Sequence, residues 1–190
     1  MEEIKVVLKG AEEVSFPKGI TPMQIAESLS RRLSKDAVAA KVNDELTDLG
    51  KAIDKDSKVE ILTFDDSEGR KVFWHSTSHI MAQAVKRLFP EVKLAIGPAV
   101  EQGFYYDFDR DESFTPEDLE RIEAEMAKIV AEGLGYHRRD VPREQALEDL
   151  RQRRENYKVE LVEDLPEDAG ISFYSQGEFK DLCAGPHIPD

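Results

Sequence analysis

Hydrophobic and polar positions follow a simple order over the first sixty residues. Residues 4–8 (IKVVL) and 14–16 (VSF) are short β-rich runs with a polar turn between them, which predicts a hairpin. Residues 37–42 and 58–63 predict two further strands, the last with clean apolar–polar alternation. Together with the helix described next, this order predicts a small β-grasp arrangement that contains neither histidine nor cysteine.

The helix of this first segment is predicted to begin after Thr21. Thr21 can cap the helix, and Gln24 completes a capping box three residues later. Ile25, Leu29 and Leu33 then recur every four residues, which predicts one buried face.

A polar stretch, residues 64–70, predicts a linker and a domain boundary. Residues 72–90 after it predict one helix that Pro90 ends. The runs 92–100 and 103–109 are β-like, and the second is rich in aromatic residues.

The remaining segments alternate helices and strands without regular βαβ spacing. A helix is predicted from Thr115 to Gly133, because Thr115 can cap its start and glycine favours its end. Its predicted buried face consists of Leu119, Ile122, Met126, Ile129 and Val130. Residues 142–155 predict a third helix, and residues 157–162 and 171–174 predict strands. This pattern predicts an α+β domain with a largely antiparallel sheet and helices on one face.

Two histidines stand out on the helix at residues 72–90. His75 and His79 are four residues apart, so they lie one turn apart on the same face. The apolar stripe of the helix lies roughly opposite this face and comprises Phe73, Trp74, Ile80, Met81, Ala84, Val85 and Leu88. Histidines that filled core space would lie on the stripe, so this pair is predicted to be functional.

The end of the chain carries a second chemically capable pair. Cys183, the only cysteine, precedes His187 by four residues, and Gly185 and Pro186 between them predict a tight loop. Three interpretations of the HxxxH and CxxxH motifs stay open: a zinc site, metal-free acid–base chemistry, and a cysteine nucleophile with a histidine base. The non-functional interpretation is a small buried cysteine and a turn-capping histidine.

Composition limits the class of protein. The chain has 190 residues, a net charge of −14 and a pI near 4.8, so alone it is expected to bind nucleic acid weakly. No apolar run approaches the roughly 20 residues that span a bilayer, so no membrane partner is expected. A lone cysteine fits a reducing cytosol and a cytoplasmic location.

Four motifs in order, FWHSTSHIMAQAVKRLFP, KLAIGPAVEQGFYYDF, ENYKVEL and KDLCAGPH, resemble the N-terminal region of bacterial threonyl-tRNA synthetases. Residues 1–63 resemble the TGS domain, a β-grasp (ubiquitin-like) module. Residues 64–190 resemble the editing domain. The family continues several hundred residues further, so this editing domain is expected to be truncated at its C-terminal end.

The resemblance implies hydrolysis of the aminoacyl ester of seryl-tRNA(Thr), which is post-transfer editing. Carried over motif by motif, the catalytic residues are His75, His79, Lys158, Cys183 and His187, and the substrate-binding residues are Tyr106 and Asp181. No metal and no cofactor are expected, and zinc held by His75, His79, Cys183 and His187 is the alternative. ATP, magnesium and a separate zinc are expected only in the aminoacylation domain, which this chain lacks.

The implied partners are tRNA(Thr) mischarged with serine and the remaining domains of the synthetase, through which the whole enzyme is expected to dimerise. Two rival functions remain. One is a freestanding, zinc-dependent trans-editing hydrolase of the alanyl type. The other is a non-catalytic module that docks tRNA or a partner.

Overall fold

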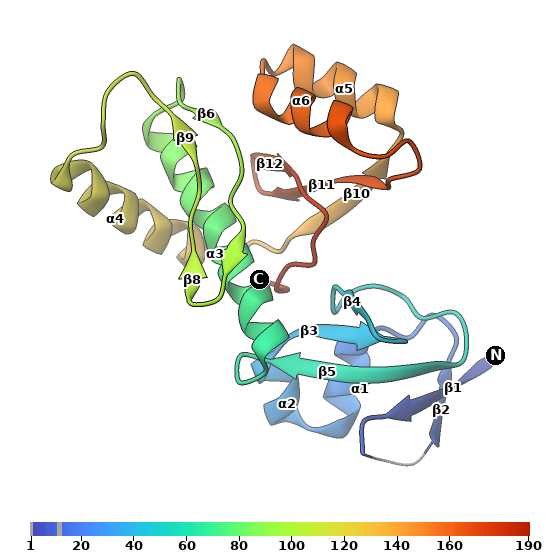
Figure 1. The fold of residues 1–190 in the computed structure, drawn as a ribbon. Helices are drawn as coiled ribbons and strands as arrows, with labels where there is room; N and C mark the ends of the chain where they lie inside the picture. The colour runs from blue at the N-terminus through green and yellow to red at the C-terminus, as the bar shows by residue number, and fades with distance from the viewer. Residues whose placement is uncertain (1, 11–12) are drawn as a thin grey trace. The chain divides into compact units, whose positions relative to one another are not determined.

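The structure, a computed structural model, describes residues 2–10 and 13–190. The chain divides into two compact units (Figure 1). The first unit comprises Met1–Phe73 and Gly185–Pro189, and the second comprises Trp74–Ala184 and Asp190. The long helix α3 (Ser67–Leu88) contributes residues to both units.

The first unit is a five-stranded sheet with two short helices. Its elements are β1 (Glu3–Leu8), β2 (Glu13–Pro17), α1 (Pro22–Leu29), α2 (Arg31–Asp36), β3 (Ala37–Val42), β4 (Glu45–Thr47) and β5 (Ser57–Thr63). The strand order is β2-β1-β5-β3-β4, with β1 and β5 parallel and every other pair antiparallel. The predicted hairpin is confirmed in β1 and β2, although residues 11–12 of its turn lie outside the described part of the chain.

The predicted single helix after Thr21 is wrong beyond its first two turns. The capping box of Thr21 and Gln24 is present, but the chain becomes extended at Ser30, which ends α1 and caps α2. Ile25 is fully buried, whereas Leu29 is 49% exposed. The four-residue recurrence therefore does not mark a continuous buried face, because the extended backbone at Ser30 ends α1 and its hydroxyl caps a separate helix.

The predicted linker 64–70 is partly helical. Helix α3 begins at Ser67, and the Asp66 carboxylate before it accepts hydrogen bonds from the backbone and hydroxyl of Thr63. A side chain at Gly69 would overlap the Thr63 carbonyl. Strand β5 therefore passes into the helix through a tight turn that needs glycine.

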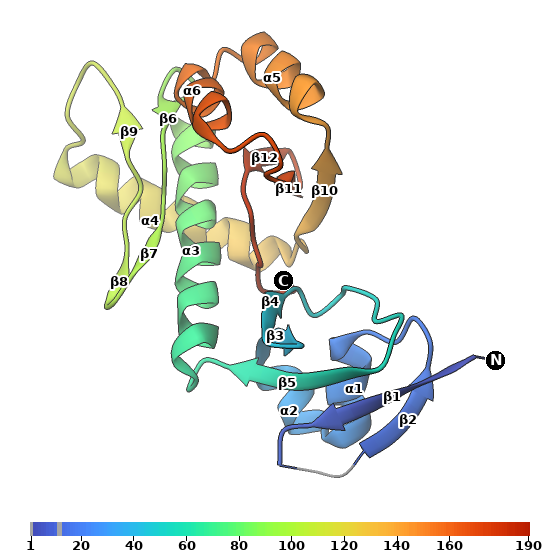
Figure 2. The same cartoon turned by 45° about the vertical axis from the view of Figure 1, so that its right-hand side comes forward.

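The second unit is built around helix α3 (Figure 2). Its other elements are β6 (Lys93–Leu94), β7 (Ala99–Val100), β8 (Gly103–Phe104), β9 (Phe108–Asp109), α4 (Pro116–Glu132), β10 (His137–Val141), α5 (Arg143–Gln152), α6 (Asn156–Asp164), β11 (Ile171–Gln176) and β12 (Phe179–Leu182). The pairs β6–β9 and β7–β8 form an antiparallel ribbon on one side of α3, and the antiparallel sheet β10-β11-β12 lies on the other. The α+β class and the largely antiparallel pairing are confirmed.

Helix α3 is covered on more than one side. Ile80, Ala84 and Val85 pack against α4 residues, as the apolar stripe predicted. Ala82, on another face, packs with Phe179 of β12. Phe73 of the predicted stripe is 38% exposed, so the stripe is wrong at that end. Because α3 is central to the unit, polar residues on its second face are buried as well.

Two further expectations are wrong in this unit. Residues 157–162 form helix α6 rather than a strand. On α4, whose predicted cap Thr115 and end Gly133 are confirmed, Ile122 and Ile129 are buried but Leu119 and Val130 are 58% and 66% exposed. The buried face of helix α4 is thus narrower than the apolar face that its sequence predicted. No helix among the described residues has the length and hydropathy needed to cross a membrane.

Candidate functional site

The two predicted motifs meet in the second unit through His75 and Cys183. Helix α3 carries His75, and Cys183 follows directly after β12. His75 Nε2 lies 2.9 Å from Cys183 Sγ, which is a hydrogen-bond distance. The backbone N–H of Cys183 donates to the Ser172 carbonyl, and the Ser172 hydroxyl donates to the Cys183 carbonyl, so the cysteine is held at the sheet edge.

The partners of His75 determine which ring nitrogen carries the proton. The imidazole also hydrogen-bonds to the Gly97 backbone, and a carbonyl can only accept. Nε2 faces Cys183, so this nitrogen and the thiol share one proton in their hydrogen bond. Burial lowers the pKa of His75, with Gly97 and Asp181 opposing the shift, so the ring is neutral at pH 7.

His79 lies one turn further along α3 and is 3% exposed. Its ring centroid is 4.9 Å from that of His75 and 6.2 Å from that of Phe179, both edge-on. Burial lowers the pKa of His79 to about 4, although Asp181, with Oδ2 3.8 Å from His79 Nδ1, favours the charged form. His79 is therefore a neutral imidazole at physiological pH.

A buried polar network surrounds Asp181, which is 2% exposed. Lys158, also 2% exposed, donates from Nζ to Asp181 Oδ1, and the Tyr106 hydroxyl donates to Oδ2 over 2.8 Å. Burial acts to raise the pKa of Asp181, but Lys158, His79 and the hydrogen bonds outweigh it and hold that pKa below its usual value. Burial and Asp181 raise the pKa of Tyr106, so its proton stays on the phenol.

Six of the seven predicted site residues thus lie within the second unit. The seventh, His187, belongs to the segment Gly185–Pro189 of the first unit, where it is 1% exposed and its backbone N–H donates to Asp48. The remaining histidine, His137, is exposed on β10.

The donor set suits zinc in its chemistry. The ligand atoms of His75, His79 and Cys183 lie within 4.8 Å of one another, and two imidazoles with a thiolate are zinc ligands. The spacing differs, since a thiolate and an imidazole on one tetrahedral zinc are roughly 3.5 Å apart. The 2.9 Å between His75 Nε2 and Cys183 Sγ is instead the length of a direct hydrogen bond.

Sequence reasoning missed three residues that support this site. The Ser78 hydroxyl lies within hydrogen-bonding distance of the carbonyls of both His75 and Gly97, and the Tyr106 ring packs on Gly97 where a side chain would overlap it. Glu155 lies 3.4 Å from Lys158 Nζ. Its spacing of three residues from Lys158 is a helical signal, which a strand prediction for residues 157–162 concealed.

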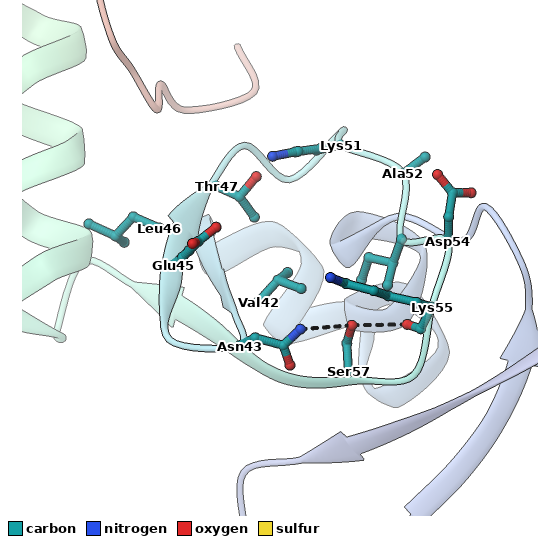
Figure 3. Close-up of a pocket in the computed structure, with 11 residues that line it drawn as sticks. Val42, Asn43, Glu45, Leu46, Thr47, Lys51, Ala52, Asp54, Lys55 and Ser57 are labelled. Atoms are coloured by element: carbon teal, nitrogen blue, oxygen red, sulfur yellow. Dashed lines mark hydrogen bonds between the residues drawn. The ribbon is translucent and has the colours of Figure 1, made fainter. Parts of the chain in front are cut away.

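The first unit holds a pocket of different character, with a volume of about 520 Å³ (Figure 3). It lies beside the β3–β4 turn and the segment that leads to β5. Asn43 donates to the Ser57 hydroxyl, which donates to the Lys55 carbonyl, so these polar groups are satisfied within the wall. The lining of this pocket contains no histidine and no cysteine.

Known proteins similar to this chain give a consistent assignment. Residues 4–63 match the TGS domain family. The chain is 54% identical over 186 residues to a threonine–tRNA ligase of Clostridium kluyveri and 56% identical over 186 residues to that of Clostridium tetani, in each case across 98% of this chain and 29% of the relative. The threonine–tRNA ligase of Carboxydothermus hydrogenoformans is 56% identical over 174 residues, which is 92% of this chain and 27% of that enzyme.

The chain therefore spans less than a third of the length of these relatives. With the TGS match at residues 4–63 and similarity across nearly its whole length, the chain corresponds to the N-terminal part of the threonine–tRNA ligases.

Proposed function

We propose that this chain carries the editing activity of a threonine–tRNA ligase, the hydrolysis of the aminoacyl ester of seryl-tRNA(Thr). The observation that carries the proposal is the contact of the half-buried His75 and Cys183 at 2.9 Å, beside the buried His79 and the buried Lys158–Asp181 pair. His79 and Asp181 are buried titratable groups with shifted pKa values. A cluster of such groups is typical of a catalytic site.

The physical need for such an activity lies in the substrates. Serine lacks one methyl group of threonine, and one methyl group supplies only about 1–3 kcal/mol of discrimination. A synthetic site that accepts threonine cannot exclude the smaller serine by size. A second, smaller site that admits serine and excludes the extra methyl group completes a double sieve.

In this proposal, water attacks the ester carbonyl and the ribose hydroxyl of the terminal adenosine leaves. A neutral histidine, His75 or His79, orients the water and takes up its proton. Lys158 stabilises the negative charge that develops on the carbonyl oxygen, and Asp181 with Tyr106 binds the amine or hydroxyl of serine. The predicted catalytic residues also include His187, which follows Cys183 by four positions in the chain.

The proposed chemistry uses no metal. The hydrogen-bonded spacing of His75 and Cys183 supports this choice, while the donor set keeps zinc as the alternative. Protein purified without chelators is expected to contain almost no zinc by elemental analysis. A content close to one zinc ion per chain would contradict the metal-free site.

The partners follow from the same proposal: mischarged tRNA(Thr) as substrate and the remaining domains of the ligase, through which the whole enzyme dimerises in the cytoplasm. Because this chain has a net charge of −14, most of the affinity for tRNA is assigned to those domains. The freestanding alanyl-type hydrolase is disfavoured by the TGS match, and the non-catalytic docking module by the buried, polar arrangement of the site.

The experiment compares deacylation of purified seryl-tRNA(Thr) by the wild-type chain, His75→Ala and His137→Ala. His75→Ala is expected to lower the rate roughly 100-fold or more, because a positioned proton acceptor is lost. His137→Ala removes an exposed histidine of the same unit and should leave the rate unchanged. Equal rates for all three proteins would contradict the proposed chemistry at α3.

A further inference from the structure

The ammonium group of Lys158 lies between two carboxylates. It is in contact with Asp181 Oδ1, and Glu155 Oε2 lies 3.4 Å away on its other side. Glu155 is the residue directly before helix α6, three positions ahead of Lys158, so the two side chains share one face of the first turn. Lysine is therefore within a short movement of a second carboxylate.

The two oxygens of the Glu155 carboxylate differ in their partners, because only Oε1 accepts a hydrogen bond while Oε2 lies in ion-pair range of Lys158. Its Oε1 accepts a hydrogen bond from Arg153, whose guanidinium also donates to the Lys180 carbonyl and to Asp149. Its Oε2 is buried and accepts no hydrogen bond from any described residue. A buried carboxylate oxygen normally has a donor, so Oε2 is an acceptor position held ready by Arg153.

Binding of the serine moiety, as proposed above, makes this second position necessary. Of the two groups of serine that Asp181 could bind in the proposed function, we take the α-ammonium group, which would meet a carboxylate whose two oxygens already accept from Tyr106 and Lys158. Two ammonium groups on one fully buried carboxylate would repel each other strongly, because the low dielectric around Asp181 screens little. One of the two cations must then leave Asp181.

We propose that the Lys158 side chain has two positions. Its ammonium group moves from Asp181 to Glu155 Oε2 when the α-ammonium group of the substrate binds Asp181. Glu155 is then a positioning residue, which acts through Lys158 and does not touch the substrate. Recognition of the amine and placement of Lys158 become one event, so a ligand without a charged amine leaves Lys158 on Asp181.

The test uses two adenosine ligands that cannot be hydrolysed, because the ester oxygen is replaced by nitrogen. One is 3′-(L-serylamino)-3′-deoxyadenosine, and the other is its L-glyceroyl counterpart, in which a hydroxyl replaces the α-amino group. Affinities are measured by calorimetry for the wild-type chain, Glu155→Gln and Glu160→Gln. Glutamine at position 155 keeps an oxygen for Arg153 but places an amide N–H₂ opposite Lys158, and Glu160→Gln is the same change at an exposed position of α6.

Glu155→Gln is expected to weaken the seryl ligand at least tenfold, because Lys158 loses its charge-assisted acceptor, and to change the glyceroyl ligand less than twofold. Glu160→Gln should change neither. Equal weakening of both ligands by Glu155→Gln would assign Glu155 a purely structural role, and no weakening would show that Lys158 does not use it. Either result overturns the inference and leaves the proposed function standing, whereas a wild-type chain that binds neither ligand would remove the proposed function itself.

Discussion

Replacement of Lys158 by methionine tests whether the site depends on a buried ion pair. Methionine keeps most of the apolar stem of the lysine but leaves the charge of Asp181, at 2% exposure, without its main partner. Removal of one partner from a buried pair is typically far more costly than loss of a surface pair. We therefore expect Lys158→Met to destabilise the second unit strongly at neutral pH.

The size of this effect has a ceiling that depends on pH. Asp181 can lose its unpaired charge by binding a proton. The free energy of this protonation rises by about 1.4 kcal/mol for each pH unit above a normal carboxyl pKa of about 3.9. The loss of stability is thus at most about 4 kcal/mol at pH 7 and about 1.5 kcal/mol at pH 5. His79, 3.8 Å away, can take the proton instead, and that route also becomes easier at lower pH.

Urea unfolding followed by the fluorescence of Trp74, the single tryptophan, measures both values. Trp74 lies in helix α3 next to His75, so it reports on the unit that carries the site. The control is Lys128→Met, which removes an exposed lysine paired with Glu125 on α4 and should cost less than about 1 kcal/mol at both pH values. A loss for Lys158→Met that is the same at pH 7 and pH 5 would refute the reasoning.

Three further predictions concern the same unit. The folded-state pKa of His79 is about 4 and lies below the unfolded value of 6.5, so its contribution to the free energy of unfolding is fully present above pH 6.5 and falls by up to about 3 kcal/mol as the pH drops to 4. His79→Gln should therefore reduce the decrease of the urea midpoint between pH 6.5 and pH 4. Gly97→Ala should cost about 1–3 kcal/mol in urea unfolding because the new methyl group overlaps the Tyr106 ring, whereas Gly170→Ala, with open space around it, should cost less than about 0.5 kcal/mol. Arg87 donates to Glu125 and Glu132 of α4 and to Glu178 between β11 and β12, so Arg87→Met should lower stability by about 1–3 kcal/mol, more than Lys128→Met, and 1 M salt should narrow that difference.

Local signals in the sequence predicted much of the secondary structure. The capping boxes at Thr21 and Thr115 and the glycine end at Gly133 are set by side chains a few residues apart, so they can be read without tertiary information. Ser30 shows the limit of this approach, because its hydroxyl competes with helix continuation inside an apparently regular apolar pattern.

Tertiary packing explains the larger errors. The alternation in residues 157–162 suits a strand, but α6 packs Val162 into a core with Leu150 and Phe173, and this burial overrides the local preference. Helix α3 is covered on two sides, so its polar face is buried, and burial of His79 and Gln83 could not be inferred from the wheel.

For the candidate site too, local spacing predicted one part, and the rest depends on the fold or on the resemblance. The face shared by His75 and His79 followed from their spacing, but their meeting with Cys183 joins residues 108 positions apart, which no local pattern contains. Lys158, Tyr106 and Asp181 entered only through the resemblance to the synthetases, and the structure connects all three in one network. Glu155 had no signal of its own until Lys158 was found on a helix.

In the proposed function, this chain removes serine from tRNA(Thr) and spares threonine. The most direct measurement is the release of each amino acid from purified seryl-tRNA(Thr) and threonyl-tRNA(Thr) by the same preparation. We predict that serine is released at least tenfold faster than threonine, because a methyl group in a close-fitting pocket is worth about 1–3 kcal/mol. Equal release of both amino acids, or release of neither at high protein concentration, would contradict it.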